Sequence, residues 1–319
     1  MRGLITVFRK ELADDFTSWR FIILFAMVFL AGVFTLYVDA QNIGGEVTGT
    51  TQFIFLKLYT TSDQTLPGLF QFLNLVAVFF VPIVGIALGF DAINEERNNG
   101  TMSRLLSQPI YRDAVINGKF LAGVVTIAIM ITSIVLIVAG VGLRMLGVPP
   151  SSEEVIRLLI FLVVTIFYGA FWLGLAILFS IFFRRVATSV LASIAVWIFL
   201  FFFMPMFAGL IANTVVVPLE QAVTADEYFS NLGVQSAVLQ LSPVRLYQEA
   251  ISVIMVPGYR TMGQMIQLMG SGTVRLLPNP LSLGQSLLMV WPHLVSILAL
   301  TAVCFAVSYV KFMREEIRA

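Results

Sequence analysis

Six stretches of the sequence contain no aspartate, glutamate, lysine or arginine, and their lengths constrain the fold. They are 18 to 35 residues long: Phe21–Val38, Gln64–Phe90, Phe120–Leu143, Leu158–Phe183, Val186–Leu219 and Leu276–Val310. A helix of about 20 apolar residues crosses the roughly 30 Å of hydrocarbon in a bilayer. Only 12% of the chain is charged, whereas soluble proteins have about 25%. The sequence therefore predicts an all-α, polytopic membrane protein with six transmembrane helices, folded as a single membrane domain over residues 1–319.

The last two runs are longer than one crossing. We expect their helices at Ala187–Ile211 and Leu287–Val310, with the remaining residues outside the membrane. Spans two and five contain Pro82 and Pro205. Proline removes a backbone hydrogen bond and kinks a membrane helix. The two prolines therefore indicate structural kinks, or hinges that let the spans move.

The distribution of lysine and arginine predicts the orientation. Thirteen of the 19 basic residues fall on the side that holds both ends of the chain, and six fall on the other side. Cytoplasmic loops of membrane proteins are enriched in lysine and arginine. We therefore expect a multi-pass protein of the cell (inner, or cytoplasmic) membrane with both termini in the cytoplasm.

Several kinds of chemistry are excluded by the residues present. The single cysteine, Cys304, excludes a multi-thiolate metal site, and the single histidine, His293, excludes a histidine-cluster site. The sequence has no His-Glu-x-x-His pattern and no pair of acidic residues inside a predicted span, so nothing indicates an intramembrane hydrolase. No glycine-rich phosphate loop ends in Gly-Lys-Ser/Thr, and no ionised residue lies inside a predicted span to carry a coupling ion. A net charge of +1 gives no reason to expect nucleic acid. The chain is predicted to have no catalytic or metal-binding residues, and its substrate-binding residues are not readable.

Two segments outside the spans have helical patterns. Residues Gly3–Trp19 repeat an apolar side chain every fourth position, which is typical of an amphipathic helix on the membrane surface, although a short solvated helix fits the same pattern. The outer loop, residues 213–286, contains the helix-compatible stretches Leu219–Gln240 and Pro243–Val256. Ser242 is expected to cap the second stretch, with Pro243 at its first position.

The longest connection on the predicted cytoplasmic side is Asp91–Lys119. Asn98-Asn99-Gly100 is a helix-stop signal, and Thr101–Ser107 is compatible with two helical turns that Pro109 would end. A short helix held away from the membrane can dock on another protein. An ordinary charged connection between two spans fits the composition equally well.

The residues of this connection resemble the cytoplasmic hallmark of export-type (type-2) ABC transporter permeases. The similar motifs are Glu96-Arg97, Gly100-Thr101, the Leu105–Pro109 block Leu-Leu-Ser-Gln-Pro, Arg112 and Gly118-Lys119-Phe120. Phe8–Leu12 resembles the opening helix of that family, and the stretch from Ser242 to Ala250 resembles its outer-loop helix. The resemblance covers most of the chain.

The resemblance implies a function for segments that composition only describes. Gly3–Trp19, within residues 1–20, would be the elbow helix, and residues 91–119 the segment that couples the permease to a separate ABC ATPase. It implies that the contact with the ATPase is made by Glu95, Glu96, Arg97, Gly100, Thr101, Leu105, Leu106, Pro109 and Arg112. No cofactor is expected on this chain, because ATP and magnesium would bind the ATPase.

The active unit would contain two ATPase subunits and two permeases, either two copies of this chain or this chain with a homologue. It would export an unidentified substrate, for which the many apolar side chains favour a hydrophobic compound. Two alternatives stay open. The ATPase could drive a membrane scaffold or mechanotransmitter that acts on an outer partner, or the chain could be an ion-coupled carrier, which the charge-free spans disfavour.

Overall fold

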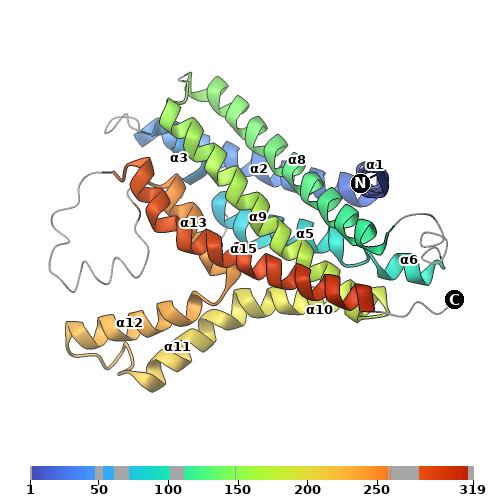
Figure 1. Cartoon of the computed structure of the whole chain (residues 1–319). Coiled ribbons are helices and arrows are strands. Elements are labelled where there is room, and N and C mark those ends of the chain that lie inside the picture. The colour runs from blue at the N-terminus through green and yellow to red at the C-terminus, as the bar shows by residue number, and fades with distance from the viewer. Residues whose placement is uncertain are drawn as a thin grey trace. The chain divides into compact units, whose positions relative to one another are not determined.

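The computed structural model describes residues 2–46, 53–60, 72–100, 111–147, 149–257, 259 and 280–314. All regular structure in these residues is helical (Figure 1), which confirms the all-α prediction. Five helices are long and apolar enough to cross a membrane, and a bent pair near the N-terminus makes a sixth if it counts as one span. The five long helices correspond to predicted spans two to six, and the bent pair overlaps the first predicted span.

The described chain forms two compact units. Unit 1 comprises Met1–Ala195 and Ile297–Ala319, and unit 2 comprises Val196–Ser296. Helices α10 (Val186–Ile198) and α15 (Leu283–Arg314) have residues in both units. Each unit is described by itself below.

Unit 1 begins with α1 (Arg2–Thr17), which confirms the predicted N-terminal helix. Helix α2 (Trp19–Glu46) follows at an angle of 62° to α1. The bend falls where the hydroxyl of Ser18 bonds the carbonyl of Asp15 and accepts the N–H of Phe21. Helix α1 packs against α8 (Arg112–Leu146) so closely that a Cβ on Gly118 would lie 2.8 Å from the side chain of Val7.

The core of unit 1 is built around α9 (Ser152–Phe182), which contains the fully buried Trp172. Helix α5 (Val81–Gly89) lies against α9 through Gly85 and Gly89. A Cβ on Gly89 would be 2.8 Å from the backbone oxygen of Leu173. Small residues let membrane helices approach this closely. Helices α8 and α9 also run alongside each other (Figure 1).

At both prolines where the sequence predicts a kink, Pro82 and Pro205, a π-helical segment directly precedes the α-helix that contains the proline. The π-helical segment η2 (Val76–Phe80) follows α4 (Phe72–Leu75) and precedes α5, which has Pro82 in its first turn. The segment η3 (Phe199–Phe203) likewise precedes α11 (Met204–Val215), which begins with Met204-Pro205. In each case the first N–H after the π segment bonds the carbonyl five residues back. The wider turn makes room for a proline ring that a regular α-helix would exclude.

A helix that the sequence did not indicate, α3 (Ile54–Thr60), is attached to the start of α9. One carboxylate oxygen of Glu154 accepts the N–H groups of Phe55 and Leu56, at 2.9 and 3.3 Å. The other accepts the N–H and hydroxyl of Ser151, the N-cap of α9, at 2.7 and 2.9 Å. A single buried carboxylate therefore caps two helices.

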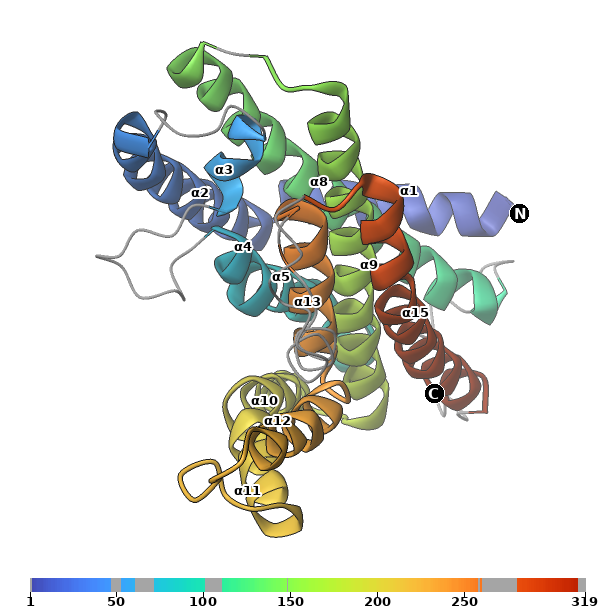
Figure 2. The ribbon, with the colours of Figure 1, turned by 90° about the vertical axis from the view of Figure 1, so that its left-hand side faces the viewer.

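Unit 2 contains a hairpin of α11 and α12 (Ala225–Leu239), which lie side by side in both views (Figures 1 and 2). Helix α12 corresponds to the predicted stretch Leu219–Gln240, but it begins six residues later than predicted. The capping box of Thr224 and Glu227 sets its first turn at Ala225. Asn231 of α12 donates hydrogen bonds to the side chain of Asn213 and the carbonyl of Val217. These bonds hold the connecting turn against the hairpin.

The second outer-loop helix, α13 (Pro243–Met255), agrees with the prediction and has Pro243 in its first turn. Ser242 is its N-cap residue, but the prediction that its side chain caps the helix is wrong. The hydroxyl instead lies 3.5 Å from the carbonyl oxygen of Leu200. Helix α13 also buries Glu249, which pairs with Arg245 at 3.3 Å and with His293 of α15 at 3.1 Å.

Candidate functional site

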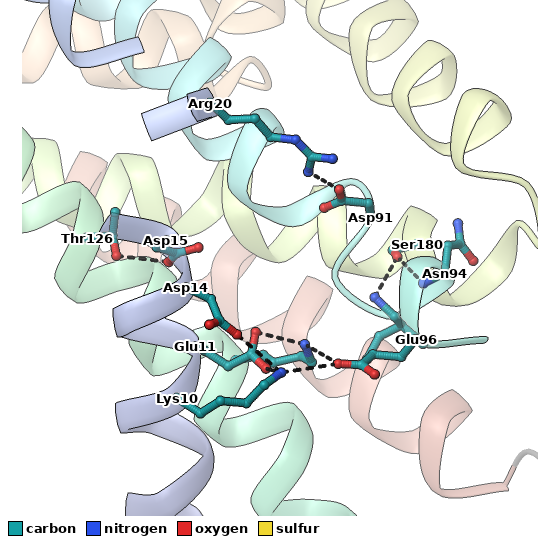
Figure 3. Close-up of polar contacts among 12 residues, drawn as sticks. Lys10, Glu11, Asp14, Asp15, Arg20, Asp91, Asn94, Glu96, Thr126 and Ser180 are labelled. Carbon is teal, nitrogen blue, oxygen red and sulfur yellow. Dashed lines mark hydrogen bonds and ion pairs between the residues drawn. The ribbon is translucent and has the colours of Figure 1, made fainter. Parts of the chain in front are cut away.

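Charged side chains collect at the end of unit 1 where α1, the start of α2, α6 (Asn94–Asn98) and the start of α8 meet (Figure 3). Helix α6 follows α5 and leads to residues 101–110, the centre of the predicted coupling segment. These elements come from two distant parts of the sequence, because α1 and α2 begin at residues 2 and 19 whereas α6 and α8 begin at residues 94 and 112. Their ion pairs therefore join segments that the chain alone does not connect.

Lys119 of α8 lies at the centre of the charged cluster. Its side chain is only 7% exposed, and its ammonium nitrogen is 2.8 Å from a carboxylate oxygen of Glu11 in α1 and 3.5 Å from one of Glu96 in α6. A buried ammonium group is stable only when it is paired and hydrogen-bonded. Lys119 therefore ties α8 to both α1 and α6.

Lys10 of α1 makes a second link to α6, at 3.5 Å from Glu96. It also pairs with Glu11 at 3.0 Å and with Asp14 at 3.4 Å. Partial burial alone would lower the pKa of Lys10, but the three carboxylates outweigh that effect and raise the pKa. Lys10 therefore stays charged throughout the physiological range.

Asp15 of α1 turns toward α8, where its carboxylate accepts a hydrogen bond of 3.0 Å from the hydroxyl of Thr126 (Figure 3). Burial raises the pKa of Asp15 to about 6, and the hydrogen bond from Thr126 opposes that rise only in part. The nearby carboxylates of Glu11 and Asp14 also raise the pKa, whereas Lys119 lowers it. Asp15 therefore binds a proton more tightly than a free aspartate side chain does.

Two further sets of bonds connect this cluster to α2 and α9. Arg20, at the start of α2, donates to Asp91, which follows α5. The hydroxyl of Ser180 in α9 accepts the backbone N–H groups of Ile93 and Asn94 at 3.0 and 3.1 Å. The guanidinium of Arg97 donates to the carbonyl of Ile181 at 3.2 Å. Helix α6 is thus bonded to α1, α8 and α9.

The same elements enclose a pocket of 590 Å³. It is lined by Lys10, Glu11, Asp14, Asp15, Ser18, Trp19, Arg20, Ala87, Leu88, Asp91, Ala92, Glu95, Glu96, Asn99, Lys119 and Gly123. Six carboxylates and three cations contribute to this lining, so the pocket has an excess of negative charge. The described residues, those of this pocket included, contain no group of three or more His, Cys, Asp and Glu side chains that could hold a metal ion.

The predicted ATPase-contact residues that the structure describes fall into three groups. Glu96 and Arg97 point inward and bond other helices of this chain. Glu95 and Gly100 are exposed, and Gly100 has a φ of +66°, as expected for a residue that stops a helix. Arg112 begins α8 and is partly buried. Thr101, Leu105, Leu106 and Pro109 lie outside the described residues, as does the predicted helix Thr101–Ser107.

The sequence prediction did not identify the contacts that hold α1 in place. Lys119 and Glu11 appeared there only as members of family motifs and Asp15 had no assigned role, although Arg20, Asp91 and Lys119 each border a charge-free run. A charge at the end of a span is a signal for a residue at the membrane surface. The signal does not indicate which charge pairs with which.

Comparison with known proteins identifies the chain. The family model of the ABC-2 family transporter proteins matches residues 5–317. The chain belongs to the ABC-2 transporter family. This family membership agrees with the resemblance of the coupling segment to ABC transporter permeases. The matched residues include the helices that form the charged cluster.

Two similar proteins are named as probable ABC transporter permease protein NosY. The one from Stutzerimonas stutzeri is 27% identical over 154 residues, which are 46% of this chain and 50% of that protein. The one from Pseudomonas aeruginosa is 29% identical over 116 residues, which are 36% of this chain and 37% of that protein. This ABC-2 protein therefore spans about half of one relative and just over a third of the other.

Proposed function

We propose that the chain is the membrane permease subunit of an ABC transporter, driven by a separate ABC ATPase that docks from the cytoplasm on the coupling segment, residues 91–119. Family membership and the permease names of the two relatives support this proposal. The chain has no phosphate loop of its own. The energy source would therefore be a partner, and two permeases would assemble with two ATPase subunits.

The observation that carries the proposal is the set of bonds around α6. This five-residue helix directly precedes residues 101–110 and is bonded to α1 through Lys10, to α8 through Lys119 and to α9 through Ser180. A displacement of α6 would therefore move three helices together. We propose that ATP-driven movement of the ATPase enters the permease by this route.

The proposal assigns different roles to two parts of the predicted contact. The segment around Leu105 and Leu106 would dock on the ATPase. Glu96 and Arg97, which bond other helices of this chain, would transmit movement rather than contact the partner. Docking and transmission can be separated by experiment because different side chains perform them.

The test uses the chain co-expressed with a candidate ABC ATPase from the same genome. Replacing Leu105 and Leu106 by asparagine should abolish co-purification of the ATPase. Lys119→Met should keep the ATPase bound, but ATP hydrolysis should no longer respond to the permease. Arg184→Gln is the control, because Arg184 is an exposed cation in the turn after α9 and should change neither property. Normal co-purification of the double asparagine variant would contradict the docking role.

Export is tested on vesicles that contain the purified permease and ATPase. Movement of a fluorescent hydrophobic compound that requires ATP would support transport. Hydrolysis without movement of any candidate compound would favour the mechanotransmitter, in which the helices of unit 2 act on an outer partner. Transport driven by a proton or sodium gradient without ATP would contradict both.

A further inference from the structure

The charged pocket between α1, α2, α6 and α8 has a volume of 590 Å³, more than the ion pairs that surround it require. Binding sites for small molecules commonly measure about 300–1,000 Å³. The exposed residues on its rim include Trp19, 78% exposed, and Arg20, whose side chain is 55% exposed. A molecule from outside the chain can therefore reach it.

The position of the pocket along the spans indicates where that molecule comes from. Three lining residues, Arg20, Asp91 and Lys119, are the charged residues that border the apolar runs beginning at Phe21, ending at Phe90 and beginning at Phe120. Leu88 and Gly123, also in the lining, lie about one turn inside those runs. The pocket thus extends from the last polar turn into the first apolar turn, which is the level of lipid headgroups in a bilayer.

The charges of the lining select among headgroups. Six carboxylates face three cations, and Asp14 and Glu95 lie on the exposed side of the pocket. This excess of negative charge repels an anionic headgroup and attracts an ammonium group. A primary ammonium group donates three hydrogen bonds, which suits a site rich in carboxylate oxygens. The exposed ring of Trp19 is a further favourable surface for a cation.

The pocket also contains a partner for a phosphate. Arg20 is bonded to Asp91 but remains half exposed, and a guanidinium has five N–H donors. Lys10 is similarly half exposed. Carboxylates beside two accessible cations match the ammonium and phosphate of one zwitterionic headgroup.

We propose that this pocket binds the headgroup of a phospholipid with a primary amine, such as phosphatidylethanolamine. The ammonium group contacts Asp14, Glu95 and Trp19, and the phosphate contacts Arg20. Bound lipid would fill the space between α1 and α6, and the link between these two helices would then depend on the lipid composition.

The test measures lipid binding to the purified chain alone, so its result does not depend on the proposed ATPase partner. Native mass spectrometry in detergent compares added phosphatidylethanolamine, phosphatidylcholine and phosphatidylglycerol. Phosphatidylethanolamine should bind about fivefold more tightly than phosphatidylglycerol, because an exposed charge pair contributes up to about that factor and two carboxylates, Asp14 and Glu95, take part. Phosphatidylcholine should bind more weakly than phosphatidylethanolamine, because choline has no N–H donor.

Variants locate the binding site. Asp14→Asn with Glu95→Gln should remove the preference for phosphatidylethanolamine, and Trp19→Ala should weaken binding about two- to fivefold. Glu220→Gln removes an exposed carboxylate in unit 2 and should change nothing. Unchanged melting temperatures of the variants show that the fold is intact.

Three results would overturn the proposal. These are equal binding of the three lipids, an unchanged preference in the Asp14/Glu95 variant, and a lysine-rich peptide that binds the detergent-solubilised chain more tightly than phosphatidylethanolamine with the same dependence on Asp14 and Glu95. The last result would assign the pocket to a basic segment of a protein partner.

Discussion

The contact between α5 and α9 gives a stringent test of the fold, and Gly89→Ala is the change that tests it. The added Cβ would lie 2.8 Å from the backbone oxygen of Leu173, 2.8 Å from the Cβ of Ala176 and 3.2 Å from the backbone nitrogen of Ile177. None of these atoms can rotate away, because two belong to the backbone and the third is fixed to it. The two helices must therefore separate by several tenths of an ångström.

The size of the effect follows from two opposing terms. Alanine favours a helix over glycine by about 1 kcal/mol. Overpacking a well-packed interface costs about 1–3 kcal/mol, and the backbone contacts of Gly89 place it toward the upper end of that range. We expect a net loss of about 1–2 kcal/mol. In a chain of this size, that loss lowers the melting midpoint by roughly 2–8 °C.

The assay is thermal unfolding of the purified protein followed by tryptophan fluorescence, to which the fully buried Trp172 of α9 contributes. The matched control is Gly140→Ala in α8, where no heavy atom lies within 4 Å of the added Cβ. The free energy of unfolding of this variant should equal that of the wild type or exceed it by up to about 1 kcal/mol. Its melting midpoint should therefore lie at or slightly above the wild-type value. If Gly89→Ala is as stable as Gly140→Ala, the close approach of α5 and α9 is refuted.

Two further predictions concern carboxylates. The pKa of Asp15 is about 6 in the folded protein and 3.8 in a free side chain, so the folded state binds this proton more tightly and stability falls as pH rises from about 4 to 6. Asp15→Asn keeps an acceptor for the hydroxyl of Thr126 but does not titrate. The difference in melting midpoint between this variant and the wild type should therefore increase as pH rises from about 4 to 6. A difference that stays constant over this range would contradict the raised pKa of Asp15. Glu154→Gln removes the charge that caps α3 and α9 and should cost about 1–2 kcal/mol, measured as a lower melting midpoint. Glu227→Gln, at the exposed cap of one helix, should give a smaller shift, and equal shifts would contradict the double-capping role.

The spans were predictable because a membrane helix must be free of charge, and that requirement is visible in the sequence. The rule fails at helix ends, where charges are tolerated. Helix α9 begins at Ser152 rather than Leu158, because the capping box of Ser151 and Glu154 starts it before the charged Arg157. The guanidinium of Arg157 is buried and pairs with Glu153 at 2.8 Å. A rule based on charge alone cannot place such a residue inside a helix.

Long-range bonds were not predictable. Helix α3 has seven residues, and its first N–H groups are capped by Glu154 rather than by a residue of its own. In the charged cluster, the coupling block was recognised by its motif. Its pairing with Lys10 and Lys119, however, depends on how α1 packs on α8. Local patterns show which residues are charged, whereas tertiary packing decides which charges meet.

The double cap of Glu154 has a consequence for biosynthesis. Phe55 and Glu154 are 99 residues apart, and Asp15 and Thr126 are 111 apart. At a synthesis rate of about 5–20 residues per second, such an interval lasts roughly 5–20 seconds. During that time α1 and α3 have been made but their partners have not. The N–H of Phe55 and the carboxylate of Asp15 therefore gain these buried partners only after α9 and α8 have been synthesised.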